Sequence, residues 1–131
     1  MTINLLEQIG ATVICNKNSI EVKELIEITP KEISVESDWS SASYFYSIVA
    51  MAPIGFKICL NSFKKDSIQG DSLVKDFFQI FGVETTFLND SIIIEKVAET
   101  KKSISLDLSS NPDLAQTICV TCLGLGIKCN L

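Results

Sequence analysis

The sequence predicts an α/β protein in which helices pack on one face of mixed β-sheets. Three observations lead to this prediction. Segments with the alternating pattern of strands take turns along the chain with segments that have the apolar period of helices. Glycine or turn residues separate these segments, and the same order of elements recurs. Strands that are joined through helices form right-handed crossovers, which place those helices against a sheet.

The chain begins with a helix and a hairpin. Residues 2–9 have an amphipathic pattern that ends at Gly10, and glycine accepts the left-handed backbone of a helix end. Strands are predicted at 11–15 and 19–23, and Asn16-Lys17-Asn18 between them has the residue types of a hairpin turn.

A strand at 32–36, a helix at 40–52 and a strand at 55–60 come next. A polar cluster marks the start of this helix, and Gly55 follows its end. A second helix–hairpin set then follows, with elements at 70–81, 83–88 and 91–96. The last set has a strand at 103–107, a helix at 111–123 and a strand at 126–130.

These sets are copies of each other. Residues 33–60 align without a gap on 104–131 at an offset of 71, and residues 1–22 align on 73–94 at an offset of 72. Joined, the two halves define a β-α-β-α-β-β unit, which is complete over 33–97. We expect the back half of a preceding unit in 1–23, the front half of a following unit in 104–131, and linkers at 24–31, 61–69 and 98–102.

The charged residues narrow the functions that this chain can perform alone. All 11 basic residues are lysines, against 16 acidic residues, and the sequence contains no arginine and no histidine. Arginine is the usual bidentate clamp for phosphate, and histidine the usual acid–base group near neutral pH. The net charge of −5 argues against a nucleic-acid partner, which needs a basic face. No apolar run is long enough to cross a membrane, and no signal peptide is recognised.

Five cysteines, an odd number, lie in apolar segments, which favours reduced, buried thiols and a cytoplasmic protein. Cys119 and Cys122 form a CxxC pair within an apolar helix. Because no second ligand pair and no histidine accompany them, core packing is favoured over a metal or redox site.

Three predicted helix starts carry the candidate chemistry. The first is the run from Ser37 to Phe45, where serines and an aspartate can cap the helix and where an anion could bind instead. Tyr44 and Phe45 are interpreted as core residues. The second is Gln69-Gly70-Asp71, where Asp71 can cap the helix or favour its dipole. The preceding Lys64 and Lys65 are interpreted as a solvated pair.

The third helix start is Asn111-Pro112-Asp113. Proline suits the first helical position, and an acid in the first turn is stabilised by the helix dipole. The dipole favours the ionised carboxylate, so Asp113 is either a helix-start residue or a proton acceptor for a nearby substrate. Asp107, at the end of the preceding strand, is a weaker candidate.

Together these runs resemble the 5-enolpyruvylshikimate-3-phosphate synthase family. The family pattern has a D-x-S-S-A-S-Y-F helix start, a Q-G-D helix start and a P-D-x-A-x-T helix start. This sequence has Asp38–Phe45, Gln69–Asp71 and Pro112–Thr117 in the same order. The β-α-β-α-β-β repeat is also the building unit of that family, arranged in two lobes. The resemblance covers the whole chain and matches the central third of such an enzyme.

The resemblance implies a reaction and a role for one residue. The 5-hydroxyl of shikimate 3-phosphate would attack phosphoenolpyruvate, and the tetrahedral intermediate would lose phosphate to give the enolpyruvyl ether, with no metal or organic cofactor. Asp113 falls on the family aspartate, which is both catalytic and substrate-binding. The other functional residues of the family lie outside this chain, so we expect this chain to be an inactive fragment by itself.

The same resemblance predicts the domain organisation. Residues 1–34 would end the N-terminal lobe and 35–131 would begin the C-terminal lobe, with the hinge near 35–38. The incomplete units expose apolar helix faces and strand edges, which we expect to be buried either by pairing with each other in one chain or by self-association between two chains. Two alternatives stay open: a fragment of the related UDP-N-acetylglucosamine enolpyruvyl transferase, and a non-catalytic α/β interaction module.

Overall fold

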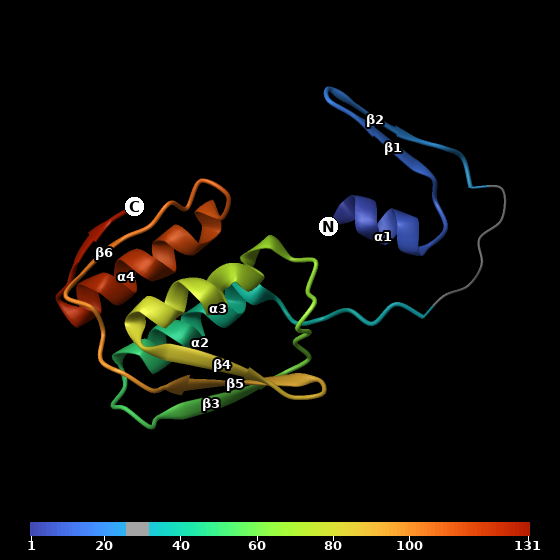
Figure 1. Cartoon of the computed structure of the whole chain (residues 1–131). Helices are drawn as coiled ribbons and strands as arrows, with labels where there is room; N and C mark the ends of the chain where they lie inside the picture. Colours follow the sequence, from blue (N-terminus) through green and yellow to red (C-terminus); the bar gives the residue numbers. More distant parts are fainter. Residues whose placement is uncertain (26–31) are drawn as a thin grey trace. The chain divides into compact units, whose positions relative to one another are not determined.

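A computed structural model describes residues 1–25 and 32–131 of the chain, which divides into two compact units (Figure 1). Unit 1 is Met1–Val35 and unit 2 is Glu36–Leu131. The boundary is one residue from the predicted one, while the assignment of the units to two lobes stays a prediction. Most of the predicted linker at 24–31 lies outside the described residues.

Unit 1 has the helix and hairpin that the sequence predicts. Helix α1 (Thr2–Gln8) precedes strands β1 (Val13–Asn16) and β2 (Ser19–Val22). The two strands pair antiparallel, with Asn16 opposite Ser19 across the turn. Ala11 is buried, whereas no residue of α1 is buried, so this unit has little core of its own.

Unit 2 contains the remaining elements in the predicted order of helices and strands. They are α2 (Trp39–Met51), β3 (Lys57–Asn61), η1 (Gly70–Leu73), α3 (Val74–Phe77), η2 (Phe78–Phe81), β4 (Val83–Phe87), β5 (Ser91–Lys96), β6 (Ser103–Ser105), η3 (Pro112–Leu114), α4 (Ala115–Leu125) and β7 (Lys128–Asn130).

An antiparallel sheet in the order β3-β5-β4 supports one side of unit 2. Helices α2 and α3 cover one face of it (Figure 1). Along β5 buried and partly exposed residues alternate, so that Ile92 and Ile94 are fully buried while Ile93 between them is partly exposed. The alternation explains why this strand was predictable, because one face is buried and the other is not.

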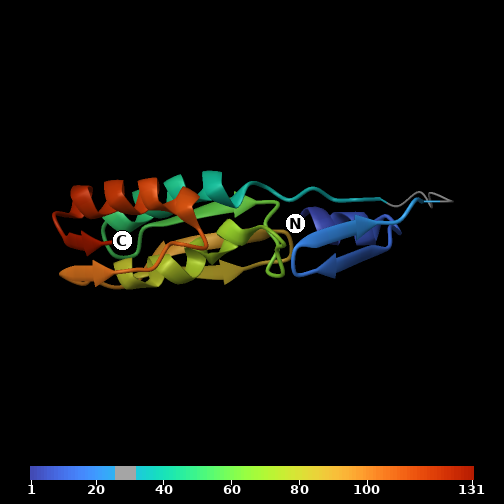
Figure 2. The same ribbon diagram turned by 90° about the horizontal axis from the view of Figure 1, so that it is seen from above.

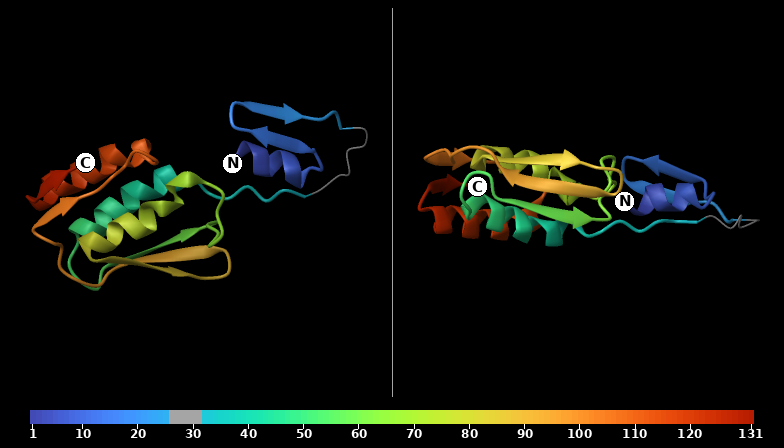
Figure 3. Two further views of the ribbon diagram at one scale, coloured as in Figure 1. Left: turned by 45° about the horizontal axis from the view of Figure 1, so that its top comes forward. Right: turned by 90° about the horizontal axis from the view of Figure 1, so that it is seen from below.

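A second, parallel strand pair belongs to the last copy of the repeat. Strands β6 and β7 pair parallel, and α4 connects them as the crossover helix. Helix α2 contacts the sheet on one side and α4 on another (Figures 2 and 3). Helices on sheets, with both parallel and antiparallel pairs among the described strands, confirm the predicted fold class.

Aromatic side chains fill the space between α2 and the sheet. Trp39 is fully buried and meets Phe63 edge to face, with ring centroids 4.9 Å apart. Tyr46 is also fully buried, and its hydroxyl lies 2.6 Å from Thr85 Oγ1. Burial raises the pKa of Tyr46 above its ordinary value, so this hydroxyl stays protonated.

The backbone supports the internal repeat. Gly10 aligns with Gly82 and Gly55 with Gly126, and all four adopt positive φ. Positive φ therefore recurs at matching positions of the repeat, although few side chains are identical.

Two predicted elements differ from the structure. No strand forms at 32–36, where Ile33 and Val35 are exposed. An alternating pattern stabilises a strand only when one face is buried, and these side chains have no such face. The helix predicted at 70–81 is broken into η1, α3 and η2. Its first turn contains glycine, aspartate and serine, which have low helix propensity.

Candidate functional site

The three motif segments meet at one end of unit 2. Ser40 Oγ, in the first turn of α2, donates to Asp71 Oδ2 at 2.5 Å. Asn111 Nδ2, just before η3, donates to Gly70 O at 3.0 Å and to Asp71 Oδ1 at 3.5 Å. Asp71 thus links the starts of three helical segments that are far apart in the sequence.

The loop before η1 is fixed to the start of α2 by its glutamine. Gln69 Oε1 accepts from the Trp39 amide at 3.0 Å, and Gln69 Nε2 donates to Ser37 O at 2.9 Å. Glu36 adds contacts, since it accepts from Ser67 Oγ at 2.5 Å and from Trp39 Nε1 at 3.4 Å. The second motif therefore docks onto the first through both backbone and side-chain groups.

The start of α2 is capped by its own aspartate. Asp38 accepts from the amides of Ser40 and Ser41 at 3.0 and 3.2 Å, and from Ser41 Oγ at 2.6 Å. The hydrogen bond from the Ser41 hydroxyl and those from the two amides hold the pKa of Asp38 below its usual value. The capping interpretation is confirmed, and a carboxylate already occupies the position that an anion would take.

Hydroxyl pairs hold α2 against α4. Ser43 Oγ lies 2.9 Å from Thr117 Oγ1, and one helical turn further Thr121 Oγ1 donates to Ser47 Oγ at 2.8 Å. All four residues are buried. Ser43 and Thr117 belong to the first and third motifs, so the motifs meet along the helices as well as at their starts. Sequence reasoning missed this pairing, although both pairs share the same separation of 74 residues.

Asp113, the predicted catalytic and substrate-binding residue, lies in η3 and is exposed. Pro112 occupies the start of this segment as expected, and Leu114 beside it is fully buried. Among the described residues, no hydrogen bond or ion pair engages the Asp113 carboxylate. The carboxylate is therefore held only by its backbone and stays open to a ligand.

Asp107 is less suited to a catalytic role. Its carboxylate accepts hydrogen bonds from the backbone amide of Ser109, at 3.0 Å, and from the hydroxyl of the same residue. These hydrogen bonds lower the pKa of Asp107, with the hydroxyl as the larger cause. Asp107 thus stabilises the loop before η3.

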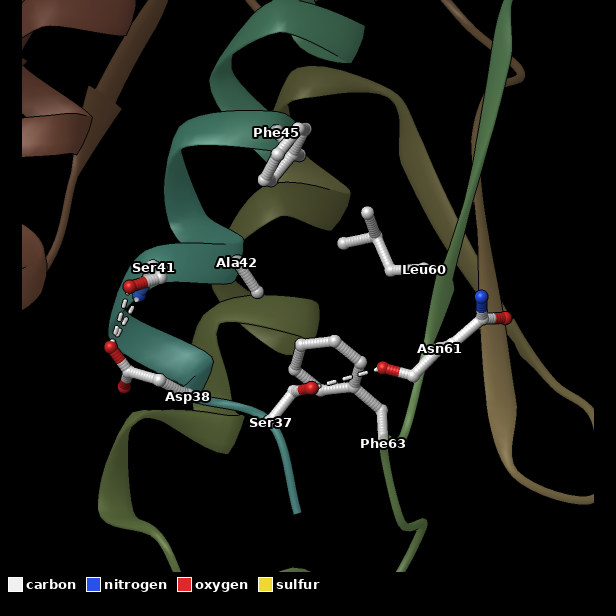
Figure 4. Close-up of a pocket in the computed structure, with 8 residues that line it drawn as sticks. All are labelled: Ser37, Asp38, Ser41, Ala42, Phe45, Leu60, Asn61 and Phe63. Carbon is white, nitrogen blue, oxygen red and sulfur yellow. Dashed lines mark hydrogen bonds between the residues drawn. The ribbon is translucent and has the colours of Figure 1, made fainter.

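A pocket of about 320 Å³ opens between the start of α2 and the end of β3 (Figure 4). Four polar residues, Ser37, Asp38, Ser41 and Asn61, and four apolar residues, Ala42, Phe45, Leu60 and Phe63, line it. Asp113 does not line it. The pocket and the exposed carboxylate are therefore separate features of unit 2.

The prediction of a core position is wrong for two aromatic residues of the first motif. Tyr44 is 62% exposed and Phe45 is 41% exposed, whereas a core position was expected. Neither residue belongs to the buried face of α2, and Phe45 instead lines the pocket between α2 and β3 together with Leu60. Lys64 and Lys65 are exposed as expected.

The cysteines also differ from the expectation of buried thiols. Only Cys122 is buried, while Cys15, Cys59, Cys119 and Cys129 are exposed. The expected core packing therefore holds for Cys122 and is wrong for Cys119, because two residues three apart in sequence can straddle the edge of a buried helix face. Burial, and next a hydrogen bond with Cys129, raise the pKa of Cys122 to about 12. Within residues 1–25 and 32–131, no cluster of three or more His, Cys, Asp or Glu side chains could hold a metal ion.

No helix in the described part of the chain is long and apolar enough to cross a membrane. The repeated units and the three interlocked helix starts belong to an α/β protein, and their match to a family model shows that it has the enolpyruvyl transferase fold. The family model described as EPSP synthase (3-phosphoshikimate 1-carboxyvinyltransferase) matches residues 1–126. The chain therefore belongs to the EPSP synthase family.

Proteins similar to this chain are named 3-phosphoshikimate 1-carboxyvinyltransferase, as in the description of the family model. A 3-phosphoshikimate 1-carboxyvinyltransferase of Bacteroides fragilis strain ATCC 25285 is 33% identical over 132 residues, which cover 97% of this chain and 31% of the relative. Relatives of that name from Methanoregula boonei and Histophilus somni are 37% and 40% identical over 70% and 73% of this chain, and 21% of each relative is covered. The chain spans less than a third of the length of these relatives.

Proposed function

We propose that this chain supplies part of the active site of a 3-phosphoshikimate 1-carboxyvinyltransferase. The reaction would move the carboxyvinyl group of phosphoenolpyruvate to the 5-hydroxyl of shikimate 3-phosphate. The observation that carries the proposal is the match of the family model over residues 1–126, together with the convergence of the three family motifs in unit 2. The names of the relatives favour this enzyme over the UDP-N-acetylglucosamine enzyme.

In this proposal Asp113 orients and deprotonates the attacking hydroxyl. A carboxylate that is exposed and unengaged among the described residues can accept a hydrogen bond from a substrate hydroxyl. As the hydroxyl oxygen bonds to the central carbon of phosphoenolpyruvate, its proton passes to Asp113, and the carbon–carbon double bond opens as the methylene carbon takes up a proton from an acid in another segment of the complete enzyme. The tetrahedral intermediate then loses a proton from the new methyl group while its bond to phosphate breaks, so that the double bond of the enolpyruvyl ether re-forms and phosphate is released.

The chain alone lacks the cations that this chemistry needs. Both substrates are phosphorylated anions, and the sequence offers 11 lysines but no arginine for bidentate phosphate contacts. We propose that other segments of a complete enzyme supply these contacts, and that residues 1–131 neither bind the substrates tightly nor turn them over.

Self-association and a cytoplasmic location are also part of the proposal. Large apolar side chains stay exposed on α2 and α4, among them Tyr44, Ile48, Val120 and Leu123. Apolar surface of this kind favours association, here between copies of the chain. Light scattering over a concentration series tests this point, and a strict monomer at every concentration would contradict it.

The function is tested with a complete enzyme that carries this segment. Purified enzyme is mixed with shikimate 3-phosphate and phosphoenolpyruvate, and released phosphate and the enolpyruvyl ether are quantified together. Equal amounts of both products support the proposal. Phosphate release without the ether, or no reaction in a folded enzyme, would refute it.

A further inference from the structure

We propose that Asp71 is a positioning residue for Asp113 and acts through Asn111. This inference rests on the proposed function of Asp113. Asn111 lies two residues before Asp113 and is 4% exposed. Its amide donates to Gly70 O and Asp71 Oδ1, and Asp71 in turn accepts from Ser40 Oγ. A path of hydrogen bonds thus runs from α2, through Asp71, to the backbone that carries Asp113.

The contacts of Asp71 differ from those of a capping acid. Gln69 is the N-cap residue of η1, and no side-chain capping hydrogen bond forms there. The half-buried carboxylate of Asp71 instead binds side chains of two other segments. The sequence had suggested a helix cap or a dipole contact for Asp71, and the cap is wrong.

The position of Asp113 depends on two buried residues that flank it closely in the sequence. Its own carboxylate has no contact within the described residues that could fix it. Leu114 on one side is fully buried, and Asn111 on the other has a non-helical backbone, with φ −140° and ψ 58°, where the chain enters η3. Asn111 therefore sets the direction in which η3 begins, and Asp71 and Gly70 hold Asn111.

Two substitutions of Asp71 separate the effect of its hydrogen bonds from the effect of its negative charge. Asp71→Ala removes both carboxylate oxygens, so Ser40 loses its acceptor and Asn111 keeps only Gly70 O. Asp71→Asn is nearly the same size, and its amide can donate to Ser40 Oγ while its oxygen accepts from Asn111. Positioning should survive in the asparagine variant, although its charge is gone.

The first experiment measures backbone amide exchange in the 131-residue chain. In Asp71→Ala, the amides of Asn111 and Leu114 should exchange about tenfold faster, as expected when a charge-assisted hydrogen bond is lost. The matched control is Asp76→Ala, which removes an exposed carboxylate paired with Lys75. In the control and in Asp71→Asn, the exchange rates of these two amides should stay unchanged. The amides of strand β5 should exchange at unchanged rates in all three variants.

Two results of this experiment overturn the inference. One is unchanged exchange at Asn111 and Leu114 in Asp71→Ala. The other is equal acceleration in β5, which would mean that Asp71 stabilises the whole unit. If Asp71→Ala does not fold, Ser40→Ala removes the other end of the path, and the same two results decide.

The second experiment measures turnover by a complete enzyme. Misplacement of a reacting group by about 1 Å lowers turnover by up to about 10²-fold. Asp71→Ala should therefore lower kcat by about 10- to 100-fold, with a smaller change in KM, and Asp71→Asn should restore kcat. A purely stabilising residue would instead lower Tm and leave kcat per folded enzyme unchanged, and equal losses in both variants would also contradict positioning. If the unmodified enzyme is inactive, the proposed function fails, while amide exchange still decides the inference.

Discussion

The cap of α2 offers a sharp test of how the first motif works. Asp38→Ala removes the acceptor for the amides of Ser40 and Ser41, which lie 3.0 and 3.2 Å from the carboxylate oxygens. The same change leaves the Ser41 hydroxyl without its 2.6 Å acceptor. Two amides in the first turn of α2 must then be satisfied by water.

The expected loss follows from this geometry. Replacing a capping aspartate by alanine costs about 0.5–2 kcal/mol of unfolding free energy, typically about 1. Asp38 is exposed, so water can replace part of the lost hydrogen bonding, and we expect a value near the middle of that range. Asp38→Asn is the matched control, because asparagine caps a helix about as well as aspartate.

The pH dependence of this effect has a defined sign. The pKa of Asp38 in the folded chain is lowered from 3.8 by the Ser41 hydroxyl and the two amides. A lowered folded pKa means that the charged cap stabilises the fold above pH 3.8, and that this contribution is lost as the pH falls through the folded pKa. The difference between Asp38→Ala and the unmodified chain should therefore shrink in acid.

Urea denaturation at neutral pH and in acid measures both effects, with tryptophan fluorescence as the signal, since Trp39 adjoins the cap and is fully buried. An alanine variant as stable as the unmodified chain at neutral pH would refute the capping account. A difference that stays constant into acid would show that the charge of Asp38 contributes nothing.

Three other outcomes are expected. Gly82→Ala should lower the Tm more than Gly55→Ala, because a Cβ at Gly82 would lie 1.9 Å from Ala98 O, whereas a Cβ at Gly55 would meet no atom within 4 Å. Equal losses of Tm in the two variants would contradict this. A thiol reagent should label Cys119 quickly and Cys122 slowly, given the burial of Cys122 and its pKa of about 12; equal rates would count against the packing of α4. Elemental analysis of the purified chain should find no stoichiometric zinc, and one zinc per chain would overturn the interpretation of the CxxC pair.

The elements that burial dictates were predictable from the sequence. Strand β5 was expected at 91–96 and forms over Ser91–Lys96, because its apolar alternation coincides with a covered sheet face. The segment at 32–36 has a similar pattern but no buried face, so its strand was predicted wrongly. An alternating apolar pattern is compatible with a strand, but the strand forms only where one of its faces is buried.

The candidate site was only partly predictable. The three helix starts were found because capping residues, glycine and proline mark them locally. The side-chain pairs that join them could not be found in this way, because Ser40 and Asp71 are 31 residues apart and Ser43 and Thr117 are 74 apart. Contacts between distant segments depend on the tertiary fold, which also exposed Tyr44 and Phe45 against expectation.

The most direct test of the proposed function is the turnover of a complete enzyme in which Asp113 is replaced by alanine. Loss of a positioned acid–base group lowers turnover by about 10² to 10⁴. We predict a loss in this range, with little change in stability, because a first-turn acid contributes only about 0.3–1 kcal/mol through the helix dipole. Turnover that is unchanged, or a variant that mainly unfolds, would show that Asp113 is a helix-start residue and would contradict its assignment as the base.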